Sequence, residues 1–126
     1  MSRVLVIDDN ADIREMLLVK LQIAGFQARA AADGEHALEQ LAAEPAEIII
    51  TDLFMPEKDG VETITEIRAR YPDASIIAMS GWQSLHGPDY LTVAREIGAV
   101  ATLRKPFDPD EMVRIVHRVE QDHERL

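Results

Sequence analysis

Short apolar runs alternate with segments of helical periodicity along the whole chain. Each run is bounded by polar or turn-forming residues, which is typical of buried strands. These runs predict five strands, at about residues 4–7, 26–31, 48–51, 76–79 and 100–103. The run at 26–31 is the least apolar of the five, and its assignment as a strand depends most on its place in the alternation.

A helix is predicted after each strand. The first, from about residue 12 to 24, has apolar residues on one face: Ile13, Met16, Leu17 and Leu21. Helical spacing recurs in residues 34–44, 61–70, 91–97 and 109–119. Asp108 precedes the last helix as its predicted cap. The polar residues 120–126 are expected to form the fraying end of that helix.

Five strand and helix units in alternation predict the fold class. Parallel strands need helical crossovers and are buried on both faces, so the continuous apolar runs favour a parallel sheet with helices on each side. We therefore expect an α/β fold with a doubly wound five-stranded parallel sheet. The chain has 126 residues, which fits one domain over 1–126 that buries about two thirds of its unfolded surface.

The composition excludes several classes of function. The chain has 13 Lys and Arg against 23 Asp and Glu, a net charge of -10, which disfavours direct binding to nucleic acid phosphates. With no cysteine it has neither a disulfide nor a thiolate metal site. The apolar run near the N-terminus is too short for a signal-peptide core or a membrane span. We expect a cytoplasmic protein without membrane insertion.

Polar side chains collect at the carboxyl ends of the predicted strands. Asp8 and Asp9 follow the first strand, Asp52 the third, Ser80 the fourth and Lys105 the fifth. In a parallel sheet these ends share one edge, where ligands bind. Carboxylates there suit Mg²⁺ or Mn²⁺. With Asp52 as nucleophile, the group predicts formation of an aspartyl phosphate, with Lys105 and the metal neutralising charge and Ser80 donating a hydrogen bond.

The same residues carry a family resemblance. Together with seven further residues, they form a set of motifs in a characteristic order and spacing: Pro56, Asp59, Gly60, Gly98, Ala99, Pro106 and Phe107. Over essentially its full length the chain resembles the receiver domain of two-component response regulators, and in particular a stand-alone receiver. This resemblance implies a flavodoxin-like sheet with strand order 2-1-3-4-5.

The resemblance also implies roles for individual residues. Asp52 would accept a phosphoryl group from a phosphohistidine of a sensor histidine kinase or a histidine phosphotransfer protein. Asp9, Asp52 and the Phe54 carbonyl would bind Mg²⁺ directly, and Asp8 would act largely through water. Lys105 would pair with the phosphoryl group.

Ser80 would move toward the phosphoryl group, and the Lys105–Pro106 peptide bond would be cis. The domain would catalyse only its own phosphorylation and dephosphorylation rather than turn over a substrate. Its output would pass through an unidentified protein partner or a homodimer, involving the surface around residues 91–118.

The sequence departs from the family pattern where the signal is read out. Thr102 occupies the position that commonly holds a Tyr or Phe in receivers, so the usual switch aromatic is missing. Trp82 and Tyr90 are candidates to replace it. The segment between Ser80 and Gly98 is also about three residues longer than in many receivers and contains helix breakers, which predicts a long loop beside the phosphate.

Two alternatives remain open at this point. One is a receiver-like interaction module that is not regulated by phosphorylation. The other is an aspartyl-nucleophile phosphatase of the haloacid-dehalogenase type, which expects an Asp-x-Asp pair after its first strand. Here Asp8 and Asp9 are adjacent and position 10 is Asn, so the phosphatase is the weaker alternative. Nucleotide binding is weaker still, because no glycine-rich loop follows the first strand.

The lifetime of the phosphate gives a first prediction. Phe54 lies two positions after Asp52, and Trp82 two after Ser80, at places that in receivers influence how water reaches the phosphoryl group. Because two aromatic side chains would crowd that path, we predict slow self-dephosphorylation. The double variant Phe54→Asn with Trp82→Ala should shorten the phosphate half-life, followed by intact mass over time. An unchanged half-life would contradict the prediction.

Overall fold

The structure is a computed structural model that describes residues 2–53, 60–81 and 90–124. Strands and helices alternate along the described chain. In order they are β1 (Arg3–Ile7), α1 (Ala11–Ile23), β2 (Gln27–Ala31), α2 (Gly34–Ala43), β3 (Ile48–Asp52), α3 (Gly60–Arg70), β4 (Ser75–Ser80), α4 (Tyr90–Glu96), β5 (Ala99–Arg104) and α5 (Pro109–Glu124).

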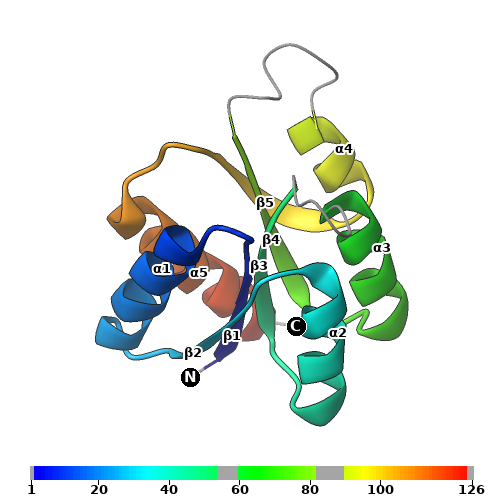
Figure 1. The fold of residues 1–126 in the computed structure, drawn as a ribbon, viewed down its shortest axis with the longest axis horizontal. Coiled ribbons are helices and arrows are strands. Elements are labelled where there is room, and N and C mark those ends of the chain that lie inside the picture. The colour runs from blue at the N-terminus through cyan, green and yellow to red at the C-terminus, as the bar shows by residue number, and fades with distance from the viewer. Residues whose placement is uncertain (1, 54–59, 82–89, 125–126) are drawn as a thin grey trace.

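The five strands form one parallel sheet, as the sequence pattern predicted, in the order β2-β1-β3-β4-β5 that the family resemblance implied. Helices α1 and α5 cover one face of the sheet, and α2, α3 and α4 cover the other (Figure 1). From β1 the sheet is extended on one side by β2; the chain then crosses back over β1 and adds β3, β4 and β5 on the other side. Strands β1 and β3, where the winding reverses, therefore lie next to each other in the centre of the sheet.

The central strands are apolar at every position because both of their faces are buried. In β1, Val4 and Val6 point toward the core beneath α1 and α5, whereas Leu5 and Ile7 point toward the core beneath α2, α3 and α4. These four side chains are fully buried. Successive residues of a strand face opposite sides of a sheet, so a two-sided core requires the continuous apolar runs seen in the sequence.

The fifth strand is less buried than predicted, most clearly at Val100. The sequence placed Val100 in a buried strand, but its side chain is 58% exposed, so that expectation was wrong. Ile76 pairs with Ala99 and the next residue, Ile77, pairs with Ala101. This shift in register leaves Val100 as an extra residue in the edge strand, and such a bulge turns its side chain out of the sheet.

The end of the last helix also differs from its prediction. Residues from Glu120 onward were expected to fray, but α5 continues to Glu124 and Glu120 is buried. Its carboxylate accepts a hydrogen bond of 2.6 Å from the backbone N–H of Ser2. The expectation was wrong for Glu120 because its buried carboxylate has a hydrogen-bond partner in Ser2, 118 residues earlier in the sequence.

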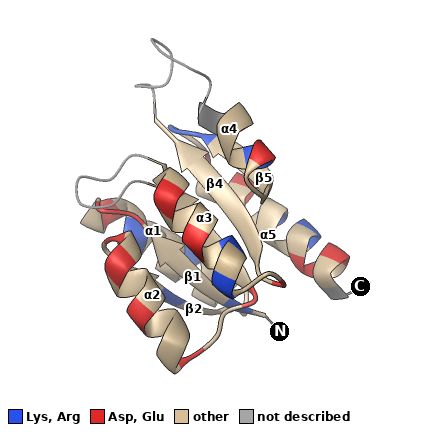
Figure 2. Ribbon diagram, turned by 90° about the vertical axis from the view of Figure 1, so that its right-hand side faces the viewer, with Lys and Arg blue, Asp and Glu red and all other residues tan. Residues whose placement is uncertain are grey.

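The surface of the α2 and α3 layer is acidic. Figure 2 shows acidic residues along both helices, and Glu35, Glu39 and Glu62 are exposed there.

Within the described part of the chain, no helix has the length and apolar character that a membrane span requires.

Side-chain caps begin α1 and α2. Asn10 caps α1 by accepting hydrogen bonds from the backbone N–H groups of Asp12 and Ile13. Asp33 caps α2 by accepting a 2.8 Å hydrogen bond from the backbone N–H of His36, and its carboxylate also lies 2.8 Å from Nδ1 of the His36 ring. The hydrogen bond from the His36 backbone lowers the pKa of Asp33, and the hydrogen bond to Asp33 raises the pKa of His36.

This cap predicts a pH dependence of stability. Because the pKa of His36 is higher in the folded state, its contribution is complete below the unfolded pKa and is lost as the pH rises through the folded pKa. We expect His36→Gln to lower the urea midpoint of unfolding clearly at about pH 5.5 and little at about pH 8. In an Asp33→Asn background, His36→Gln should have no pH-dependent effect. A loss of equal size at both pH values would contradict the ion pair.

Candidate functional site

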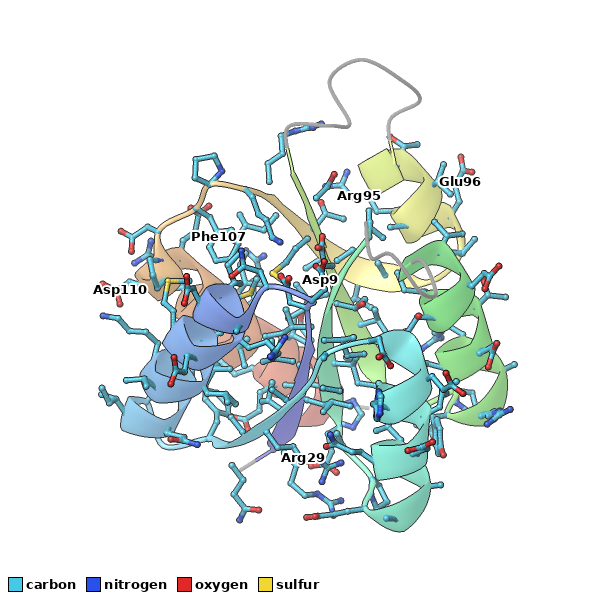
Figure 3. The ribbon with its side chains drawn as sticks, in the orientation of Figure 1. Asp9, Arg29, Arg95, Glu96, Phe107 and Asp110 are labelled. Carbon is cyan, nitrogen blue, oxygen red and sulfur yellow. The ribbon has the colours of Figure 1, made fainter. Side chains whose placement is uncertain are left out.

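Three carboxylates meet at the carboxyl edge of the sheet. Asp8 and Asp9 follow β1 and Asp52 ends β3, the two central strands. One oxygen from each of the three lies within 4.8 Å of the others. Asp8 and Asp52 are buried, whereas Asp9 is exposed at the upper edge of the sheet beside the beginning of α1 (Figure 3). The predicted acidic group is therefore assembled as one site.

Both oxygens of the Asp8 carboxylate already accept hydrogen bonds. Oδ1 accepts from the backbone N–H of Asn10 at 2.9 Å, and Oδ2 accepts from Nζ of Lys105 at 2.8 Å. The backbone N–H of Asp8 donates to the carbonyl of Ala31 at the end of β2. Asp8 is thus tied to β2, to the beginning of α1 and to the segment after β5, which fixes its buried carboxylate in one orientation.

Lys105 brings a positive charge to the carboxylates. Its backbone N–H donates a 2.7 Å hydrogen bond to the carbonyl of Ser80, and its Nζ lies 3.3 Å from Oδ2 of Asp52. Burial by itself would lower the pKa of Lys105, but the hydrogen bond to Asp8 and the negative charge of Asp52 raise it above its usual value. The Lys105–Pro106 peptide bond is cis, the geometry that the resemblance implied.

The carboxylates and Lys105 line a cavity of about 790 Å³. Its lining also includes four apolar residues: Ile13, Met16, Pro106 and Phe107. Figure 3 labels Phe107. The helical pattern assigned Ile13 and Met16 to the buried face of α1 together with Leu17 and Leu21. The first turns of α1 extend past the end of β1, so the same face there borders the cavity, which periodicity alone does not indicate.

The backbone beneath Asp52 is held by close contacts. The N–H of Leu53 donates to the carbonyl of Met79 at 2.9 Å, and the N–H of Gly60 donates to the carbonyl of Leu53 at 3.0 Å. A Cβ atom at Gly60 would lie 2.2 Å from the carbonyl oxygen of Asp52. The glycine of the motif therefore allows α3 to begin directly against the backbone that carries Asp52.

Ser80 and Thr102 lie at the edge of the site rather than in it. Ser80 is buried, and its hydroxyl donates a 3.4 Å hydrogen bond to the carbonyl of Gly81. Gly81 lines the cavity, whereas Ser80 does not. Thr102 pairs with Ala78 in the sheet, and its hydroxyl accepts a 2.7 Å hydrogen bond from the guanidinium of Arg95. A polar contact between α4 and β5 thus occupies the place of the usual aromatic residue (Figure 3 labels Arg95).

Several predicted residues lie outside the described part of the chain. They include two with expected roles in the site, Phe54 and Trp82, and the motif residues Pro56 and Asp59. The side chain of Tyr90 and most of the long loop after Ser80 also lie outside it. Their expected roles remain predictions.

One contact with the site was not indicated by any pattern in the sequence. Nη1 of Arg14, in α1, donates a 2.7 Å hydrogen bond to the backbone carbonyl of Asp8. Neither helical periodicity nor motif spacing distinguishes this arginine from a solvent-exposed one, because the bond depends on how α1 is placed against the end of β1.

Residues 4–117 match the response regulator receiver domain family. The chain belongs to this family. It is 31% identical over 120 residues to the regulatory protein AtoC of Escherichia coli K12, covering 95% of this chain and 25% of AtoC. It is 37% identical over 111 residues to the probable transcriptional regulator ycf27 of Porphyridium aerugineum, covering 88% of this chain and 45% of that protein.

The fold agrees with a solved receiver structure. The chemotaxis protein CheY4 of Vibrio cholerae is 31% identical and superposes with a TM-score of 0.85, covering 94% of this chain and 98% of CheY4. The receiver family accounts for the sheet order and for a signalling role in two-component systems. It favours neither the unregulated interaction module nor the haloacid-dehalogenase phosphatase, and no enzymatic family is indicated.

The contact at Gly60 predicts a loss of stability. Gly60→Ala must displace the backbone of Asp52 and Leu53, and we expect it to lower the free energy of unfolding by about 2 kcal/mol. Gly34→Ala is a matched control, since Gly34 is likewise the first residue of its helix. The three atoms nearest to its added Cβ all belong to the side chain of Thr63, the closest at 2.1 Å, and not to the backbone. Urea titration should show the smaller loss for Gly34→Ala. An equal or smaller loss at Gly60 would contradict the argument.

Proposed function

We propose that Asp52 of this receiver domain is the phosphoacceptor of a two-component phosphorelay. The observation that carries the proposal is the ammonium of Lys105, which lies 2.8 Å from Asp8 and 3.3 Å from Asp52 beside an open cavity. A lysine in this place can pair with a phosphoryl group on Asp52 without moving far. The exposed carboxylate of Asp9 lies within reach of the same point.

The reaction is a phosphoryl transfer between two side chains. A carboxylate oxygen of Asp52 attacks the phosphorus of a phosphohistidine and forms the new P–O bond. The P–N bond breaks, and its electron pair goes to the imidazole nitrogen, which then takes up a proton. Lys105 stabilises the negative charge on the phosphoryl oxygens, and a rotation of the Ser80 side chain would bring its hydroxyl to one of them.

The donor set fits a hard divalent cation. Three carboxylates against one ammonium leave two negative charges, which Mg²⁺ or Mn²⁺ balances. Asp9, Asp52 and the Phe54 carbonyl would hold the ion directly. Asp8 would contact it through water, because both of its carboxylate oxygens already accept hydrogen bonds. When bound, the ion neutralises and orients the phosphoryl oxygens.

The partners of this domain are proteins. The donor would be a sensor histidine kinase or a histidine phosphotransfer protein in the cytoplasm. The signal would leave through a downstream protein or a second copy of the chain, and the net charge of -10 argues against direct contact with nucleic acid. The chain spans about a quarter of AtoC and less than half of ycf27, so the activities of those whole proteins are not transferred to it.

Phosphorylation can be tested with a small donor. Incubation with acetyl phosphate and Mg²⁺ should add one phosphate to the intact mass, and chelation of the metal with EDTA should prevent it. Asp52→Asn should show no adduct, because its amide is a poor nucleophile. Asp33→Asn, which removes one acid away from the site, is the matched control and should be phosphorylated like the wild type.

Other outcomes would identify other functions. A phosphatase would release inorganic phosphate over many turnovers, without a stable adduct. An interaction module that is not regulated by phosphorylation would show no adduct under any condition. An adduct of equal amount in Asp52→Asn would place the phosphoacceptor elsewhere and contradict the proposal.

A further inference from the structure

Arg14 contacts the backbone of the site. It belongs to α1, and its side chain extends back to the end of β1, where Nη1 donates a 2.7 Å hydrogen bond to the backbone carbonyl of Asp8. Arg14 is half-buried and is absent from the cavity lining, which contains its neighbour Ile13. Its contact with the site is therefore made through the backbone and not through the cavity.

The carbonyl that Arg14 contacts belongs to the peptide unit between Asp8 and Asp9. On one side of this unit Asp8 is already fixed, by the bond of its N–H to Ala31 and by the two bonds of its carboxylate. On the other side, the side chain of Asp9 is exposed. Rotation of this peptide plane would turn Asp9 relative to Asp52. The hydrogen bond from Arg14 opposes that rotation, and a guanidinium holds its donors in a rigid plane.

We infer that Arg14 is a positioning residue for the cation: it holds the Asp8–Asp9 peptide so that the Asp9 carboxylate faces Asp52. This inference rests on the proposed function, since it assumes that Asp9 and Asp52 bind the metal together. Groups that orient metal ligands from outside the coordination sphere contribute about tenfold or more to metal affinity.

The positive charge of Arg14, taken alone, predicts a change in metal affinity of the opposite sign. A guanidinium close to the carboxylates repels a divalent cation, so its removal should tighten metal binding if charge alone acts. If Arg14 instead orients Asp9, its removal should weaken metal binding despite the more negative site. The direction of the change therefore separates positioning from electrostatics.

Mn²⁺ is a suitable probe because the electron paramagnetic resonance signal of free Mn²⁺ gives the bound fraction directly. We expect Arg14→Gln to raise the Mn²⁺ dissociation constant about tenfold. Arg14→Lys, which keeps the charge and a donor, should fall between that variant and the wild type. Lys20→Gln is the matched control: it removes the same charge from the same helix, at a side chain that pairs with Asp110 instead of the site.

A double-mutant cycle tests whether Arg14 acts through Asp9. In an Asp9→Asn background, Arg14→Gln should cause no further loss of Mn²⁺ affinity, whereas a general loosening of the structure would still weaken binding. Thermal unfolding of each variant shows whether the fold is retained, and Arg14→Lys carries the test if Arg14→Gln does not fold.

The outcomes distinguish this inference from the function on which it rests. If Arg14→Gln binds Mn²⁺ as tightly as the wild type or more tightly, Arg14 does not position Asp9, and phosphorylation of Asp52 is unaffected by that result. If the wild type binds no Mn²⁺ and forms no adduct with acetyl phosphate, both the proposed function and the inference are overturned.

Discussion

The ammonium of Lys105 lies between the carboxylates of Asp8 and Asp52, and the rest of the site depends on this contact. Three carboxylates with oxygens within 4.8 Å repel one another, by about 3 kcal/mol for each pair at the effective dielectric near a protein surface. Lys105 offsets part of this repulsion. Asp8 and Asp52 in turn raise the pKa of Lys105, although its burial alone would lower that pKa. The charge that remains is negative, which is the condition for a cation and a phosphoryl group to bind there.

The topology of the sheet makes this contact possible. Lys105 follows β5, which is separated from β3 by β4 and from β1 by β4 and β3. The chain after β5 crosses the edge of the sheet, and the hydrogen bond from the Lys105 N–H to the Ser80 carbonyl anchors it on β4. From there the lysine side chain reaches Asp52 and Asp8. The same edge receives α3 at Gly60, where the absence of a side chain lets the helix begin against the Asp52 backbone.

The supports of the site differ in kind from its connection to the surface. Asp8 is held by backbone groups of β2 and α1 and by Arg14, which are short contacts in the interior of the edge. At Thr102, by contrast, β5 contacts α4 through a hydrogen bond from the exposed Arg95. This receiver therefore combines a firmly held Asp8 with a polar, solvent-accessible contact at Thr102, where an aromatic residue is usual.

The sequence by itself determined the order of elements, the parallel sheet and the meeting of Asp8, Asp9, Asp52 and Lys105 at one edge. It could do so because continuous apolar runs indicate strands buried on both faces, and the ends of parallel strands share an edge. Only the tertiary structure decided that Val100 turns outward, that Glu120 is buried, that Ile13 and Met16 line the cavity and that Arg14 reaches the Asp8 carbonyl. These features depend on strand register and on where a helix passes the end of a strand, and both are set by contacts between segments distant in sequence.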